Sequence, residues 1–179
     1  MQCPSCKQDK LKPIKLEPNL AALTCNHCHG VQINLLSYRT WVENNPEAVT
    51  QDKQTTTLIE SDISDSKQAL LCPKCSKLMT KYTISGEHNN RVDLCAFCDE
   101  AWLDQGEWQL LKQLEINHKL TSVFTDPWQK NIRKEKEEKN YEQRIKDKFK
   151  DDYSKLIEVK NWITHHEYST DIMNFINRK

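Results

Sequence analysis

The stretch CPKCSKLMTKYTISGEHNNRVDLCAFC, residues 72–98, begins and ends with a CxxC pair. Nineteen residues separate the pair Cys72 and Cys75 from the pair Cys95 and Cys98. Two thiolates three positions apart can lie on one tight turn and point at one ion about 2.3 Å away. If the intervening residues form a hairpin, the second turn comes to lie opposite the first. The spacing therefore predicts a tetrahedral four-cysteine zinc site.

The same arrangement occurs near the N-terminus, where eighteen residues separate Cys3 and Cys6 from Cys25 and Cys28. These four pairs contain all eight cysteines of the chain. The first pairs of the two sets are offset by 69 positions and the second pairs by 70, so a unit of roughly forty residues is duplicated. We expect two structural Zn²⁺ ions, one in each unit.

Each unit is too small to fold by burying its own apolar side chains, so the metal must supply the missing stability. Zinc binding of about 10–16 kcal/mol is then also folding free energy. The N-terminal segment MQCPSCKQDK lacks the apolar stretch of a secretory signal. We therefore expect a cytoplasmic protein, whose reduced cysteines bind metal rather than form disulfides.

Composition narrows the classes of partner. Of the 179 residues, 37% are hydrophobic and 29% charged, with 26 lysines and arginines against 26 aspartates and glutamates. This balance gives no general attraction to nucleic acid or to an anionic membrane. No apolar run approaches the roughly 20 residues that span a bilayer. We expect no membrane partner.

Short apolar segments flank each pair of cysteines. Residues 11–16 and 22–24 are the expected arms of the first hairpin, and residues 78–84 and 91–94 those of the second. A strand at residues 101–103 then leads into a helix reaching about Lys119.

The start of that helix has the pattern of a capping box. Asp104 is its expected N-cap, and Glu107 can accept a hydrogen bond from the cap amide. Asn34 is the corresponding cap in the first unit. Trp41, Trp102 and Trp108 follow the second cysteine pairs and are expected to pack in the core.

The C-terminal third favours helices. Asp126-Pro127-Trp128-Gln129 is a helix start, a second helix is expected near Asp151, and Ser169 or Thr170 could cap a third. The chain therefore divides into a first ribbon (1–43), a flexible linker (44–70), a second ribbon with its capped helix (71–120) and a helical region (121–179). The expected fold class is small, metal-stapled α+β: two zinc ribbons of short antiparallel hairpins plus a helix, then an α-helical element. We expect the ribbons to share little core.

The sequence CAFCDEAWLDQGEW, residues 95–108, resembles the bacterial transcription-factor zinc-finger family, named for its likeness to the zinc ribbon of transcription factor IIB. That family usually reads C-P-x-C-G-G-x-W-L-D-x-G-E in its second half. The matching residues are Cys95, Cys98, Trp102, Leu103, Asp104, Gly106 and Glu107. Asp99 and Glu100 stand where two glycines commonly fall. The resemblance covers residues 70–115, and residues 1–42 more loosely, and it implies a zinc ribbon.

Three classes of function fit these patterns. The first is a non-catalytic docking or adaptor module on a macromolecular assembly, such as the transcription or translation machinery. The second is direct nucleic-acid binding through the lysines of the first hairpin, Lys7, Lys10, Lys12 and Lys15. The third is a thiol redox switch, although a redox CxxC normally begins a helix near a βαβ pattern, which this sequence lacks.

Two further sets of residues could be read as functional. His27 and His29 flank Cys28, but four cysteines already complete a tetrahedral site, so we expect these histidines at the surface. His165 and His166 are interpreted as an exposed helix end. A catalytic zinc keeps an open position, which a four-cysteine site lacks. We therefore expect neither enzymatic activity nor a small-molecule substrate.

Overall fold

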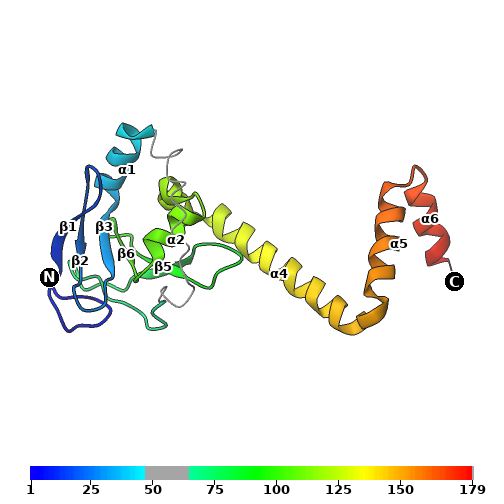
Figure 1. The fold of residues 1–179 in the computed structure, drawn as a ribbon, viewed down its shortest axis with the longest axis horizontal. Helices are drawn as coiled ribbons and strands as arrows, with labels where there is room; N and C mark the ends of the chain where they lie inside the picture. The colour runs from blue at the N-terminus through cyan, green and yellow to red at the C-terminus, as the bar shows by residue number, and fades with distance from the viewer. Residues whose placement is uncertain (47–64, 179) are drawn as a thin grey trace. The chain divides into compact units, whose positions relative to one another are not determined.

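The strands of both repeats join in one antiparallel sheet. The computed structural model describes residues 1–46 and 65–178, and the chain divides into two units, Met1–Arg133 and Lys134–Lys179. The strands of the first unit are β1 (Lys12–Glu17), β2 (Leu20–Thr24), β3 (Val31–Asn34), β4 (Thr80–Thr83), β5 (Arg91–Cys95) and β6 (Glu100–Leu103). They lie in the order β1-β2-β3-β6-β5-β4 (Figure 1). The α+β class is confirmed, but the sheet is larger than two short hairpins.

The two repeats meet at the centre of this sheet, where β3 pairs with β6. The register joins Val31 to Leu103, Gln32 to Trp102, Ile33 to Ala101 and Asn34 to Glu100. With the repeat offset of 70, Gln32 and Trp102 are equivalent positions, and the pairs on either side of them exchange. A pseudo-two-fold axis therefore passes between Gln32 and Trp102. The pairing leaves neither β3 nor β6 with an open edge.

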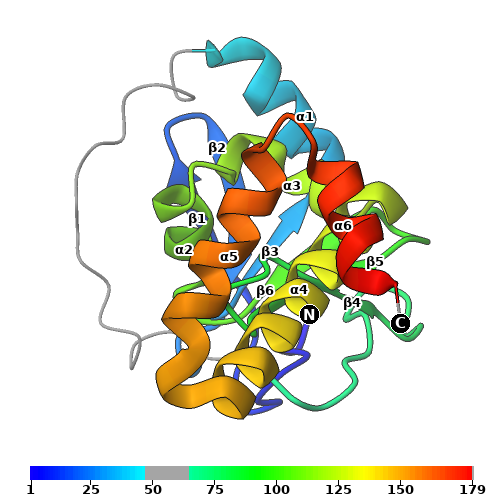
Figure 2. The ribbon, with the colours of Figure 1, turned by 90° about the vertical axis from the view of Figure 1, so that its right-hand side faces the viewer.

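One face of the sheet carries a core built from both repeats. Helices α1 (Leu35–Asn44), α2 (Glu107–Gln113) and α3 (Leu120–Val123) lie against it (Figures 1 and 2). Ile33 and Leu103 are buried there with Tyr38 and Trp108. The Tyr38 hydroxyl donates to the Asn117 carbonyl at 2.7 Å and so ties α1 to the other repeat. The expectation of little shared core was wrong, because the β3–β6 pair makes the two apolar faces continuous.

The predicted helix caps are confirmed in part. Asn34 Oδ1 accepts a hydrogen bond from the Ser37 amide at 3.1 Å and caps α1. Glu107 Oε2 accepts from the Asp104 amide at 2.8 Å, the bond predicted for a capping box, but Gly106 and not Asp104 occupies the cap position of α2. The Asp104 carboxylate makes no cap bond to α2, because it accepts from Trp102 Nε1 at 2.9 Å instead.

The helix after β6 is shorter than predicted. Helix α2 ends at Gln113, and Glu115 adopts a left-handed φ of 56°, which stops the helix. A 3-10 turn at Asn117–Lys119 and the short α3 follow.

Most of the predicted linker, residues 47–64 of 44–70, lies outside the described residues. Residues 65–70 are described, and they pack on the second repeat. The Ser66 amide donates to Asp104 Oδ2 at 2.6 Å, and Asp65 pairs with Arg91 at 2.8 Å. Leu70 is buried beside the cysteines.

The helical C-terminal third is confirmed. Helix α4 (Asp126–Phe149) starts at the predicted residue, and α5 (Tyr153–His165) and α6 (Ser169–Asn177) follow. Ser169 is the first residue of α6, but neither it nor Thr170 caps the helix, since Tyr168 occupies the cap position without a side-chain bond. None of the helices in the described residues is long and apolar enough to cross a membrane.

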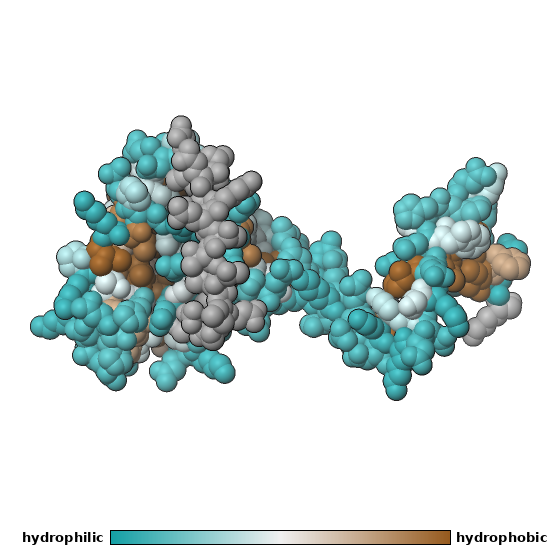
Figure 3. Space-filling model, in the orientation of Figure 1, coloured by the Kyte–Doolittle hydropathy of each residue, from teal (hydrophilic) through white to brown (hydrophobic). Residues whose placement is uncertain are grey.

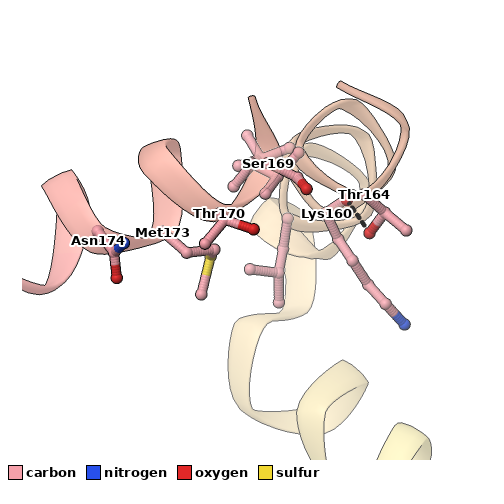
Figure 4. Close-up of a pocket in the computed structure, with 9 residues that line it drawn as sticks. Lys160, Thr164, Ser169, Thr170, Met173 and Asn174 are labelled. Atoms are coloured by element: carbon pink, nitrogen blue, oxygen red, sulfur yellow. Dashed lines mark hydrogen bonds between the residues drawn. The ribbon is translucent and has the colours of Figure 1, made fainter. Parts of the chain in front are cut away.

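Helices α5 and α6 contact each other and leave an apolar groove between them. None of residues 134–178 is buried, and apolar side chains gather between the two helices (Figure 3). The groove holds about 700 Å³. Figure 4 shows its lining, which is Leu156, Val159, Lys160, Ile163 and Thr164 of α5 and Ser169, Thr170, Met173 and Asn174 of α6.

Candidate metal centres

The eight cysteines gather in two groups of four. One consists of Cys3, Cys6, Cys25 and Cys28, and the other of Cys72, Cys75, Cys95 and Cys98. Within each group all four Sγ atoms lie within 4.8 Å of one another. The sequence spacing predicted both groups, and every predicted ligand lies in its expected group.

The sulfur spacing fits one divalent ion in each group. The Sγ–Sγ distances are 3.5 Å for Cys3–Cys28 and 3.6 Å for both Cys6–Cys25 and Cys75–Cys95. A tetrahedron with metal–sulfur bonds of about 2.3 Å has its sulfurs about 3.8 Å apart. A few tenths of an ångström of side-chain movement would therefore suffice to coordinate the ion.

All four CxxC turns share one backbone feature. The residue after each second cysteine is left-handed, with φ of 58° at Lys7, 55° at His29, 59° at Ser76 and 52° at Asp99. Glycine adopts this conformation without the Cβ clash that other residues incur. None of the four is glycine, so each turn holds a conformation that its own residue disfavours.

The turns direct backbone amides at the sulfurs. The amide of Lys77 bonds to the Cys75 sulfur and is the main reason that the pKa of this thiol falls to about 7, although burial opposes the fall. Burial raises the pKa of Cys6, but the Gln8 amide and the neighbouring thiols outweigh it and lower this pKa to about 6.

The thiolate is the form that binds metal. One thiol in each group, Cys6 in the first and Cys75 in the second, is therefore substantially ionised at neutral pH. Burial raises the pKa of Cys3 and of Cys72. Coordination must displace protons from these two thiols, so metal binding should release protons.

Both groups lie on the face of the sheet opposite the helices. Trp102 alternates with Ala101 and Leu103 along β6, so its ring points away from the core that those two residues join. The ring is fully buried in a cluster that contains cysteines of both groups. Gly30 lies against it, and a Cβ at Gly30 would overlap the Trp102 ring.

A buried carboxylate connects the repeats beside the second group. Glu100, two residues after Cys98, accepts from Gln32 Nε2 at 3.0 Å and from Asn34 Nδ2 at 3.1 Å. It also accepts from Lys74 Nζ at 3.2 Å, and Lys74 lies between Cys72 and Cys75. The carboxylate therefore touches β3 and a CxxC turn of the second group at once.

The histidines join neither group. Within the described residues, the groups of side chains that could hold a metal consist of cysteines alone. His27 and His29 are exposed, as expected from the sequence. The His166 ring instead packs against Trp162, with ring centres 5.2 Å apart.

The lysines proposed for nucleic-acid binding are all exposed. Lys7 and Lys10 lie at the first CxxC turn and just before β1, and Lys12 and Lys15 lie on β1. Their exposure is compatible with binding an anionic partner, which remains a prediction.

Sequence reasoning missed Gly30, Glu100 and Lys74 as residues that connect the metal centres. One signal was available for Gly30, since the chain has only three glycines and this one follows a CxxC pair. Glu100 stands in a glycine position of the family pattern and has no local signal, because its partners lie 66 and 68 residues away.

Comparison with protein-family models, curated proteins and solved structures finds no match to this chain. The geometry of the two cysteine groups is therefore the basis on which a function can be inferred.

Proposed function

We propose that the chain is a non-catalytic zinc-binding protein, whose two four-cysteine ribbons form a docking module for a macromolecular assembly. The observation that carries this proposal is that each group offers four sulfur ligands to one ion. Structural zinc sites are closed by four protein ligands, whereas catalytic sites keep one position for water or substrate. The ions would therefore hold the fold together and leave no open coordination position for chemistry.

Zinc is the metal that the donor set favours. Tetrahedral four-sulfur sites in proteins hold zinc or iron, and thiolates disfavour magnesium and calcium. Native mass spectrometry of the full chain should give two zinc ions per molecule. Elemental analysis of the same sample distinguishes zinc from iron, and a metal-free folded protein would overturn the proposal.

Exposed aromatic and apolar groups support a docking role. Phe97, between Cys95 and Cys98, is 70% exposed, and Lys77 Nζ lies 3.3 Å from the centre of its ring. In the α5–α6 hairpin, Trp162 is 57% and Phe175 79% exposed. Aromatic side chains are enriched among the residues that contribute most to interface affinity. The resemblance of residues 95–108 to the transcription-factor zinc-finger family supports the zinc-ribbon part of the proposal. Transcription or translation machinery is one such assembly that we propose.

A nuclease-controlled pull-down tests the docking role. Tagged full-length protein should recover a stoichiometric protein partner before and after nuclease treatment. Phe97→Ala should weaken this recovery if the second ribbon makes the contact, whereas Leu36→Ala, at an exposed position of α1, is the matched control. Recovery that disappears entirely with nuclease would contradict protein docking.

Direct nucleic-acid binding is the second candidate, and the exposed lysines of the first ribbon favour it. Titration with single- and double-stranded oligonucleotides at several salt concentrations should then show affinity that falls as salt rises. Lys10→Gln with Lys12→Gln should reduce that salt dependence, and Lys134→Gln with Lys136→Gln provides a charge-matched control. No binding at low salt would remove this candidate.

A further inference from the structure

We infer that the two metal centres are thermodynamically linked, so that metal bound at either group raises the affinity of the other. This inference rests on the proposed function, since it requires both groups to bind metal. It adds a coupling between the centres that the CxxC spacing does not imply, and it follows from three contacts across the β3–β6 pair.

The first contact joins the first centre to Trp102. The carbonyl of Gly30 accepts from the Cys25 amide at 3.0 Å, so the backbone of Gly30 is part of the turn that holds Cys25 and Cys28. The Trp102 ring occupies the space where a Gly30 side chain would lie. Trp102 also packs in the buried cluster that contains Cys72 and Cys95. If this turn opens when metal leaves the first centre, the Trp102 ring loses its contact with Gly30. The packing of the buried cluster around the second centre is then disturbed.

The second contact is the Glu100 carboxylate. Its donors Gln32 and Asn34 belong to β3, which begins directly after the first centre, and its donor Lys74 belongs to the second centre. Glu100 is 7% exposed, so water would not readily replace these donors. Loss of order in β3 would leave a buried carboxylate beside Cys98 without two of its hydrogen bonds.

The third contact fixes the turn at Cys98 against α1. The carbonyl of Asp99 accepts from the Leu35 amide at 2.8 Å, and the Asp99 carboxylate lies 3.8 Å from the Arg39 guanidinium. Leu35 and Arg39 follow β3 in the first repeat. A CxxC turn of the second centre is therefore held by residues whose position depends on the first.

These contacts indicate that the coupling is positive, so that each bound ion raises the affinity of the other centre. Binding the first ion orders β3 and β6 together, so the second ion binds to a partner strand that is already ordered. Coupling between sites is reciprocal and is typically about 5- to 150-fold in affinity. Each centre should therefore bind Zn²⁺ about 5- to 150-fold more tightly when the other is filled.

Zinc titration of the full-length chain against a competing chelator tests the linkage. Cys6→Ser with Cys28→Ser disables the first centre and should weaken Zn²⁺ binding at the second by the coupling factor. Cys75→Ser with Cys98→Ser should weaken the first centre in the same way. Equal affinity of each centre with and without the other would overturn the linkage.

A variant that keeps all eight cysteines protects the test against misfolding. Wild-type protein should bind its two ions with positive cooperativity, and Glu100→Gln should reduce it, because an amide cannot accept all three hydrogen bonds as a carboxylate does. Glu43→Gln, at an exposed position of α1, should leave cooperativity unchanged. If the wild-type protein binds its two ions independently, the linkage is wrong but the proposed function stands. If the wild-type protein binds no ion, both the linkage and the proposed function are wrong.

Discussion

Gln32 and Trp102 face each other across the β3–β6 pair, and they are the same position in the two copies of the repeat. Their side chains have different tasks on the shared face of the sheet. Gln32 donates to Glu100 at 3.0 Å, and Trp102 fills the space beside Gly30. At the centre of the sheet the backbone pairing is therefore symmetric, but the contacts of the two side chains differ. Exchanging either residue for the other would lose contacts.

Gly30→Ala tests the close approach to Trp102. The added methyl group would overlap the ring, and overpacking of a core typically costs about 1–3 kcal/mol. We expect the free energy of unfolding of the zinc-loaded protein to fall by this amount in urea titrations. Gly86→Ala, in the β4–β5 connection where φ is not positive, is the control and should change it far less. A Gly30→Ala protein as stable as the wild type would show that the ring can move aside.

Cys95→Ala tests whether the repeats unfold together. Removing one ligand weakens a site whose zinc supplies about 10–16 kcal/mol, which matches or exceeds the 5–15 kcal/mol stability of a typical domain. Because β3 pairs with β6, we expect amide protection to be lost in β1–β3 as well as in β4–β6. Hydrogen exchange measures the amide protection of both sets of strands in one experiment. Full protection of β1–β3 in this variant would mean that the repeats are independent.

Ser76→Gly tests the left-handed CxxC turn. Ser76 has φ of 59°, a conformation that costs an L-residue about 1–2 kcal/mol and glycine little. After the entropic cost of a new glycine, we expect the variant to gain up to about 1 kcal/mol, visible as a higher Tm of the zinc-loaded protein. Ser5→Gly, within the first CxxC turn but without a positive φ, should lower Tm instead. The opposite order of the two Tm values would contradict the strain argument.

Glu107→Gln tests the buried carboxyl group at the start of α2. Burial, and next the charge of Asp104, raise the pKa of Glu107 well above its usual range. A carboxyl group whose pKa is raised by folding stabilises the fold below its unfolded pKa of about 4.3, and this contribution is lost as pH rises through the folded value. Glutamine stays neutral and can still accept from the Asp104 amide.

The stability of the Glu107→Gln variant relative to the wild type should therefore rise with pH above about 4.3. Urea unfolding of both zinc-loaded proteins at several pH values measures this difference, in which the competition of protons with zinc cancels. The exposed Glu43→Gln serves as the control. A difference that does not change with pH would show that Glu107 ionises normally in the fold.

The metal centres were accessible to sequence reasoning because their geometry is local. A CxxC pair fixes two sulfurs on one turn, and a hairpin of eighteen or nineteen residues fixes the other two. The β-strands and the start of α4 were predicted for the same reason, since Asp126 and the short apolar segments act over a few residues.

The pairing of the two repeats in one sheet could not be predicted from the sequence, because nothing within the four residues of β3 specifies a partner some 70 positions away. The predicted length of α2 was wrong for a related reason. The apolar spacing of Trp108, Leu111 and Leu114 suits a longer helix, but the chain turns at Glu115, and the Asn117 carbonyl beyond the turn accepts from Tyr38. Long-range contacts decided both outcomes.

The pseudo-two-fold pairing has a consequence for how the sheet assembles. A single repeat would carry an unpaired strand whose natural complement is a second molecule of the same repeat, with Gln32 opposite Gln32 or Trp102 opposite Trp102. Carrying two copies on one polypeptide turns that bimolecular encounter into an intramolecular one, at an effective concentration set by the connecting chain. The pairing of β3 with β6 therefore does not depend on the concentration of the protein.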